Sequence, residues 1–316
     1  MGARFRLTAS ALAVAAALCT GAAAGQVLGP VGPGDDPPSS APSRSSSGEH
    51  DRHAVAGAGA AAAPADPADL AGTSARAAAE GLLATVDGYT FSAESTLLDG
   101  TAGAPFRFRI TDPAGAVVHD YAVTHERQLH LVLVARDLAA YHHLHPTLEA
   151  DGSWAVALPA LTPGAYRAFA AFTVAGGPAL TLGLDLFVPG GALYSPLPPP
   201  AGRAAVHGYD VSVTGAPALG EGGEVAITLT SGGAPVTDLE PYLGALGHLV
   251  VIRASDLALV HTHPLDGGAA GAPAGPTVRF HVAVSAPGAH RMFFEFAHGG
   301  ALHTAPFTVH VPPPPP

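Results

Sequence analysis

The sequence contains two copies of one pattern, about 120 residues apart. Each copy opens with a Gly-Tyr pair, continues to a His-Leu-Val run, and later has a Pro-Gly-Ala run before its last strands. Self-similarity at a fixed period indicates repeated structural units. A copy of about a hundred residues fits one immunoglobulin-like domain. The matched positions are Gly88 and Gly208, His130 and His248, and Pro163 and Pro287.

Both copies consist of short β-type runs separated by glycine, proline and aspartate, such as residues 106–110 and 131–134. Short strands at turn-punctuated spacing are typical of a β-sandwich. We therefore predict an all-β chain with two tandem immunoglobulin-like β-sandwich domains. The first spans 87–188 and the second 204–311, with a Gly/Pro-rich linker at 189–203 and a proline tail at 312–316.

Alternation within the second Pro-Gly-Ala run indicates which side chains enter the core. Residues two apart in a strand share a face, so Met292, Phe294 and Phe296 lie on one face and are expected to be core. The other face carries Phe293 and Glu295. Trp154, the only tryptophan, is expected to be a core aromatic residue in the first domain.

The first 75 residues predict export rather than folded structure. Residues 1–25 have two arginines, an apolar run at 9–18 and small residues at 22–24, which is the pattern of a cleaved signal peptide. The apolar run is short for an uncleaved anchor, which needs ~20 residues. Residues 26–75 lack apolar periodicity and predict a disordered stalk. We expect a secreted or cell-envelope protein with no membrane span after signal removal.

Charge and cysteine content narrow the ligands that this chain can bind. With 14 Lys+Arg against 25 Asp+Glu, the net charge of −11 argues against nucleic acid, which requires a dense cationic face. Cys19, the only cysteine, lies inside the predicted signal peptide. A metal site in the mature chain must therefore use histidine, carboxylate or backbone ligands.

A histidine triplet occurs once in each copy with identical spacing. A histidine opens a strand, and two more follow thirteen and fifteen residues later in a His-x-His-Pro sequence. Residues i and i+2 share a strand face, and a returning strand lies ~4.7–4.9 Å away, so three imidazoles can converge. The six candidate metal ligands are His130, His143, His145, His248, His261 and His263.

Three histidines with an open fourth position suit Zn²⁺ or Cu²⁺. For any single histidine, a hydrogen bond within a loop is the simpler interpretation, and the repeated pattern is what favours metal. The sequence leaves open whether the triplets form two sites or face each other in one. Protonation below about pH 6.5 is expected to compete with the metal.

These strings also resemble a known family. HLVLVARDL at His130 with HLHP at His143, and HLV at His248 with HTHP at His261, resemble secreted bacterial proteins described as heavy-metal-binding, whose second module looks like the YtkA-like β-sandwich domain. The resemblance covers about residues 88–311 and implies an envelope role in handling a metal such as copper. His142 stands where the family has glutamine, which leaves its role open.

The sequence thus favours a non-enzymatic extracytoplasmic protein that holds copper or zinc in metal homeostasis. One alternative is a structural or adhesive immunoglobulin-like module that binds another envelope protein without metal. A second is a three-histidine metalloenzyme, which needs a general base. Glu126 lies near the first triplet, but Gly244 occupies its place in the second copy.

Overall fold

The computed structural model describes residues 80–260, 262–266 and 274–315. The chain divides into two units, Met1–Ala61 and Ala62–Pro316, and all described residues belong to the second. The predicted signal peptide and stalk lie outside the described residues. The regular elements in the described ranges are all β-strands, and none of these residues forms a helix long and apolar enough to cross a membrane.

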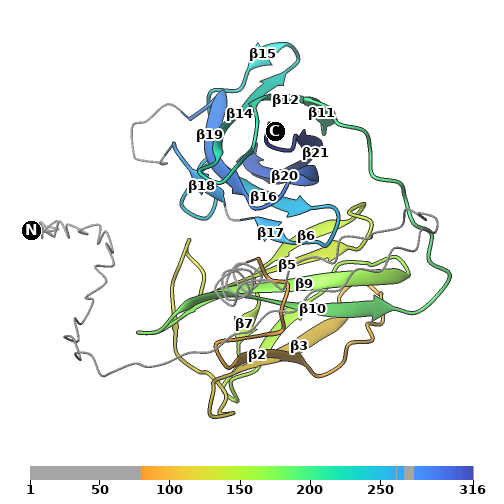
Figure 1. Cartoon of the computed structure of the whole chain (residues 1–316), viewed down its shortest axis with the longest axis vertical. Helices are drawn as coiled ribbons and strands as arrows, with labels where there is room; N and C mark the ends of the chain where they lie inside the picture. The colour runs from red at the N-terminus through yellow and green to blue at the C-terminus, as the bar shows by residue number, and fades with distance from the viewer. Residues whose placement is uncertain (1–79, 261, 267–273, 316) are drawn as a thin grey trace, which may run out of the picture. The chain divides into compact units, whose positions relative to one another are not determined.

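The first sandwich consists of two antiparallel sheets (Figure 1). One sheet has the order β1 (Thr85–Val86), β2 (Tyr89–Ala93), β3 (Pro105–Thr111), β8 (Trp154–Ala157) and β7 (Thr147–Leu148). The other has the order β10 (Ala179–Val188), β9 (Gly164–Val174), β5 (Leu129–Ala135) and β6 (Tyr141–Leu144), with β4 (Tyr121–Ala122) also paired to β9.

The second sandwich repeats this plan after a strand-free stretch at 189–202. Its larger sheet has the order β11 (Arg203–Val206), β12 (Tyr209–Gly215), β14 (Gly223–Ser231), β19 (Thr277–Val284) and β13 (Ala218–Leu219), with β15 (Ala234–Pro235) on β14 and β18 (Thr262–Pro264) on β19. Its smaller sheet has the order β17 (Leu259–Val260), β16 (His248–Arg253), β20 (Gly288–His298) and β21 (Ala301–Val311). The prediction of an all-β chain with two tandem immunoglobulin-like sandwiches is confirmed.

Each sandwich has its own aromatic core. In the first, Trp154 is 1% exposed and contacts Phe108, with ring centroids 6.5 Å apart, and Tyr121, at 4.9 Å. In the second, Met292, Phe294 and Phe296 are each fully buried. Both predictions about core residues are confirmed.

The opposite face of β20 is buried as well, for a different reason. A third apolar cluster joins the outer faces of the β5–β9 sheet and the β16–β20 sheet, and the ring of Phe293 stacks on Tyr141 with centroids 4.2 Å apart. Phe293 and Glu295 are only 3% and 2% exposed. This cluster contains Val132, Val134, Leu138 and Phe169 from the first sandwich and Ile252, Leu257 and Phe293 from the second.

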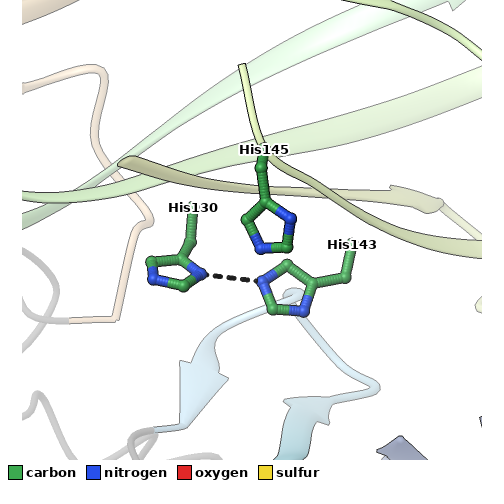
Figure 2. Close-up of side chains that lie close together, drawn as sticks. All are labelled: His130, His143 and His145. Atoms are coloured by element: carbon green, nitrogen blue, oxygen red, sulfur yellow. Dashed lines mark hydrogen bonds between the residues drawn. The ribbon is translucent and has the colours of Figure 1, made fainter. Parts of the chain in front are cut away.

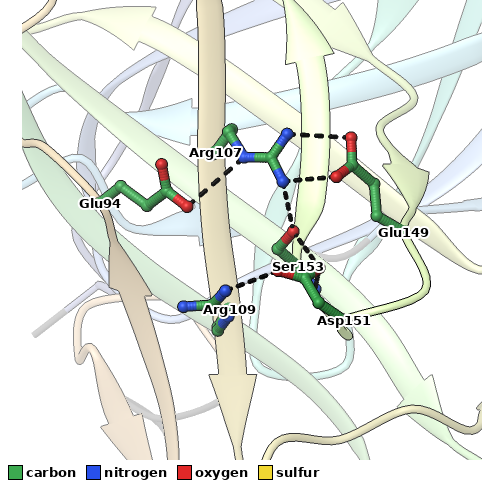
Figure 3. A network of polar contacts seen from close by, with 6 residues as sticks. All are labelled: Glu94, Arg107, Arg109, Glu149, Asp151 and Ser153. Atoms are coloured by element: carbon green, nitrogen blue, oxygen red, sulfur yellow. Dashed lines mark hydrogen bonds and ion pairs between the residues drawn. The ribbon is translucent and has the colours of Figure 1, made fainter.

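An ion-pair network lies on the other sheet of the first sandwich (Figure 3). Arg107 on β3 donates to both carboxylate oxygens of Glu149 and to Ser153 Oγ, and Glu94 lies on its far side. Arg109 pairs with Asp151 at 2.7 Å. These contacts join β3 to the turn before β8 and are partly solvent-exposed, so they position the turn rather than form a ligand site.

Gly183 on β10 is a position where the fold requires a glycine. Its N–H donates to Leu83 O, and a Cβ added there would lie 1.9 Å from Gly81 O, a backbone atom that also accepts a hydrogen bond from Arg167. We expect Gly183→Ala to lower the free energy of unfolding by about 1–3 kcal/mol because the strand must shift. Urea denaturation measures this. Gly191→Ala, where an added Cβ meets no atom within 4 Å, is the control, and equal midpoints for the two variants contradict the prediction.

Candidate metal centre

Three histidines of the first sandwich meet at the open end of the β5–β6 hairpin (Figure 2). His130 is the second residue of β5, His143 lies on β6, and His145 directly follows the last residue of that strand. Their ring centroids are 4.8–5.2 Å apart. One ring nitrogen from each lies within 4.8 Å of the others, which is the spacing that one shared ion requires.

Hydrogen bonds define which ring nitrogens are free to bind a ligand. His130 Nε2 lies 3.0 Å from Thr124 O, and because a carbonyl only accepts, Nε2 carries the proton. His143 Nδ1 lies 2.7 Å from Glu295 Oε2 and donates to that carboxylate. The remaining nitrogens, His130 Nδ1 and His143 Nε2, are 3.1 Å apart. A proton on either nitrogen makes this contact a hydrogen bond. When both rings are neutral with their other nitrogens protonated, two lone pairs face each other, and a cation between them would relieve their repulsion.

His145 contributes the third nitrogen of this arrangement. Its Nε2 is buried, and no hydrogen-bond partner for it is found among the described residues. A buried polar atom without a partner costs about 1–3 kcal/mol, so its place beside two other lone pairs favours a ligand. The three histidines together have the donor set of a tri-imidazole metal site.

Burial favours the neutral form of His130 and of His145. Desolvation lowers the pKa of His130 to about 4, with the neighbouring His143 acting in the same direction. Desolvation, followed by the charges of His143 and His130, lowers the pKa of His145 to about 3. A shared proton is therefore a poor substitute for a metal near neutral pH. We accordingly expect proton competition to begin at a lower pH than the 6.5 of an ordinary histidine.

A tight turn precedes both β5 and β16, and in each copy it holds the first histidine of the triplet through a hydrogen bond. Thr124 and Arg127 exchange backbone hydrogen bonds, as do Tyr242 and Ala245 in the second copy. His248 Nε2 donates to Tyr242 O at 2.7 Å, at the same six-residue separation as His130 and Thr124. The turns require positive φ at both central residues, which is adopted by His125, Glu126, Leu243 and Gly244.

Two histidines of the second predicted triplet, His248 and His263, lie in the described residues. His248 lies beside the first triplet, with its ring centroid 6.5 Å from that of His143. His263 lies on β18, opposite His281 of β19 in the larger sheet, so it and His248 belong to different sheets. His261 lies outside the described residues. Among the described residues, the group of His130, His143 and His145 is the one that meets the distance requirement, and a second three-histidine site stays a prediction.

A cleft gives solvent access to the site. It has a volume of about 400 Å³, and its lining includes His125, Arg127, His130 and Phe172. The cleft offers room for water or another small donor next to His130. An ion held by three imidazoles needs such a fourth ligand for tetrahedral coordination.

The whole repeated region matches one family of proteins. A family model described as a domain of unknown function, DUF8832, matches residues 84–186 and again 204–313. The chain belongs to this family. The two DUF8832 matches coincide with the two sandwiches. The repeat found in the sequence therefore corresponds to the domain that defines this family. The YtkA-like resemblance and a heavy-metal-binding family are separate predictions that this match does not test.

Comparison with solved structures found matches of low similarity to this DUF8832 chain. The adhesin FdeC of Escherichia coli is 14% identical with a TM-score of 0.24, and the alignment covers 72% of this chain and 65% of that one. A two-domain fibronectin type-III segment of chicken tenascin is 10% identical with a TM-score of 0.22, covering 70% and 95%. Domains 4 and 5 of the S-layer protein SbsC are 9% identical with a TM-score of 0.22, covering 71% and 96%. Values this low carry no inference about function. Comparison with curated proteins found no match.

The sequence of this DUF8832 protein did not identify Glu295 as a residue of the site. Across the strands, His248 pairs with Glu295, whereas its counterpart His130 pairs with Ala171. The available signal was the position of an acidic residue inside the apolar run Met-Phe-Phe-Glu-Phe. A charged residue on a strand with two buried faces requires a partner.

Three further histidines of the second sandwich, His207, His298 and His303, have their own contacts. His298 accepts from the hydroxyl of Tyr209 at 2.7 Å and pairs through Nε2 with Asp238 at 3.0 Å. His303 and His207 are joined through their Nδ1 atoms at 3.0 Å. These contacts tie β21 and the β11–β12 turn to the sandwich, which is a sufficient role for them.

Proposed function

We propose that this protein binds a divalent transition metal, copper or zinc, through His130, His143 and His145. The observation that carries the proposal is the 3.1 Å approach of His130 Nδ1 and His143 Nε2, each in a ring whose other nitrogen donates a hydrogen bond. Their two lone pairs and that of His145 suit one cation. The predicted signal peptide supports a site outside the cytoplasm, where the protein would hold or transfer metal rather than catalyse a reaction.

The donor set favours borderline metals over hard ones. Imidazole suits Zn²⁺ and Cu²⁺, whereas Ca²⁺ and Mg²⁺ prefer oxygen ligands. The metal-ligand group among the described residues contains three histidines and no carboxylate. We therefore expect calcium and magnesium to bind at least ten times more weakly than zinc.

A structural or adhesive module without metal is the second candidate. The described residues form two sandwiches joined by an apolar cluster, an arrangement that serves equally to present a surface to another envelope protein. In that case the histidines only hydrogen-bond their turns. This candidate predicts no saturable metal uptake.

Titration calorimetry of the purified, metal-stripped protein with Zn²⁺ and Cu²⁺ tests the proposal. We expect saturable uptake of one ion per protein molecule. This uptake should be lost when His130, His143 and His145 are all replaced by alanine. The control is His310→Ala, which removes an exposed histidine of β21. Weak uptake that is equal in all three proteins contradicts the metal site and supports the structural module.

A further inference from the structure

The second sandwich contributes a charged side chain to the histidine site. Glu295 lies on β20, and its Oε2 is 2.7 Å from Nδ1 of His143 on β6. The side chains of His143 and Glu295 are only 6% and 3% exposed. This hydrogen bond joins residues 152 positions apart in the sequence. The carboxylate also interacts with the hydroxyl of Tyr141, whose pKa is raised by burial and by Glu295.

We propose that Glu295 positions His143 for the metal across the contact between the sandwiches, so that metal binding and sandwich docking stabilise each other. The inference rests on the proposed metal site and deepens it, because it assigns the second sandwich a part in a site whose ligands all come from the first. A carboxylate that accepts the second N–H of a ligating histidine fixes its tautomer and raises its basicity.

The charge of the Glu295 carboxylate explains why a bound metal ion should stabilise this contact. The Glu295 carboxylate is buried, and its described neighbours His143 and Tyr141 offer hydrogen bonds but no cationic side chain such as lysine or arginine, so its loss of hydration is costly. A divalent ion on the far side of His143 supplies the opposite charge through the ring. The Glu295 carboxylate is therefore better stabilised when the metal is bound than when it is absent.

The surrounding packing holds Glu295 in place. Its neighbour Phe293 stacks on Tyr141, two residues before His143, with ring centroids 4.2 Å apart. The carboxylate position is thus fixed by the same apolar cluster that joins the sandwiches. The counterpart in the first sandwich is Ala171, which faces His130 in the strand register and has no carboxylate to offer. Glu295 is therefore specific to the second copy.

Linkage makes the effect reciprocal. If docking of the second sandwich raises metal affinity, then metal must stabilise the docked arrangement by the same factor. Amides of β20 should consequently exchange more slowly when metal is present, although β20 supplies no ligand. Protection of this strand reports on docking and not merely on coordination.

Two substitutions in the full protein test the proposal. Glu295→Gln keeps a hydrogen-bond acceptor for His143 but removes the charge, and Glu295→Ala recreates the residue of the first copy. We expect zinc affinity, measured by chelator competition, to fall about tenfold in the glutamine variant and up to about 100-fold in the alanine variant. The metal-free glutamine variant should melt at or above the temperature of the wild type, because a buried charge has been removed. A purely structural role predicts that stability and affinity fall together.

Hydrogen exchange supplies the second measurement. Zinc should slow amide exchange in β20 of the wild type and do so less in Glu295→Gln. Glu224→Gln, at an exposed position of β14, is the matched control and should behave as wild type in every assay. Failure of the wild type to bind zinc overturns the proposed function itself. Zinc binding with unchanged affinity in both Glu295 variants overturns only the coupling between the sandwiches.

Discussion

His143→Asn is expected to abolish tight zinc or copper binding while leaving the fold intact. The asparagine amide nitrogen can replace Nδ1 as a donor to Glu295, but nothing replaces Nε2, the atom 3.1 Å from His130 Nδ1. The loss in affinity should exceed the 10–100-fold typical of an outer-shell group, because a ligand itself is removed. Calorimetric titration with Zn²⁺ measures the affinity, and thermal melting of the metal-free protein measures the fold.

His143→Ala separates the two roles of this residue. It removes the ligand and also removes the hydrogen bond that His143 Nδ1 donates to the buried Glu295 carboxylate. Breaking a buried pair by removing one partner costs about 3–5 kcal/mol. The alanine variant should therefore lose both affinity and stability, and the asparagine variant only affinity. Retained zinc binding in the asparagine variant excludes His143 as a ligand.

The first triplet was accessible from the sequence because it depends on local geometry. His130, His143 and His145 belong to one hairpin, so strand alternation and the spacing of adjacent strands are enough to bring them together. The internal repeat likewise gave both sandwiches and their order. Burial of Trp154 and of the face with Met292 followed from period-two alternation.

The features that could not be predicted from the sequence depend on contacts between residues far apart in the chain. Glu295 lies 152 residues from His143, and no local pattern indicates which strand packs on which. The same limit applies to Phe293, which alternation places opposite the core but which is buried against the other sandwich. Equal spacing of the two triplets also does not give equal surroundings at the described positions, since His248 lies beside the first triplet while His263 lies on another sheet.

Trp154→Ala should lower the free energy of unfolding by about 3–5 kcal/mol, the usual cost of removing a large buried aromatic side chain. Trp154 is 1% exposed, and its ring contacts Phe108 and Tyr121 in the core of the first sandwich. Trp154→Phe should cost less, because it keeps most of the apolar contact with Phe108 and Tyr121. Urea denaturation of the metal-free proteins measures both losses.

The Trp154→Ala variant also allows metal binding to be detected as a gain in the free energy of unfolding. A ligand that binds only the folded state stabilises it by about 2.7 kcal/mol at a free concentration 100 times its Kd. Zinc at that level should therefore restore more than half of the stability that Trp154→Ala loses, because the triplet belongs to the same sandwich as the tryptophan. Adding His143→Asn to Trp154→Ala should remove this recovery without deepening the original loss. Recovery that persists in the double variant would place the stabilising ion elsewhere in the chain.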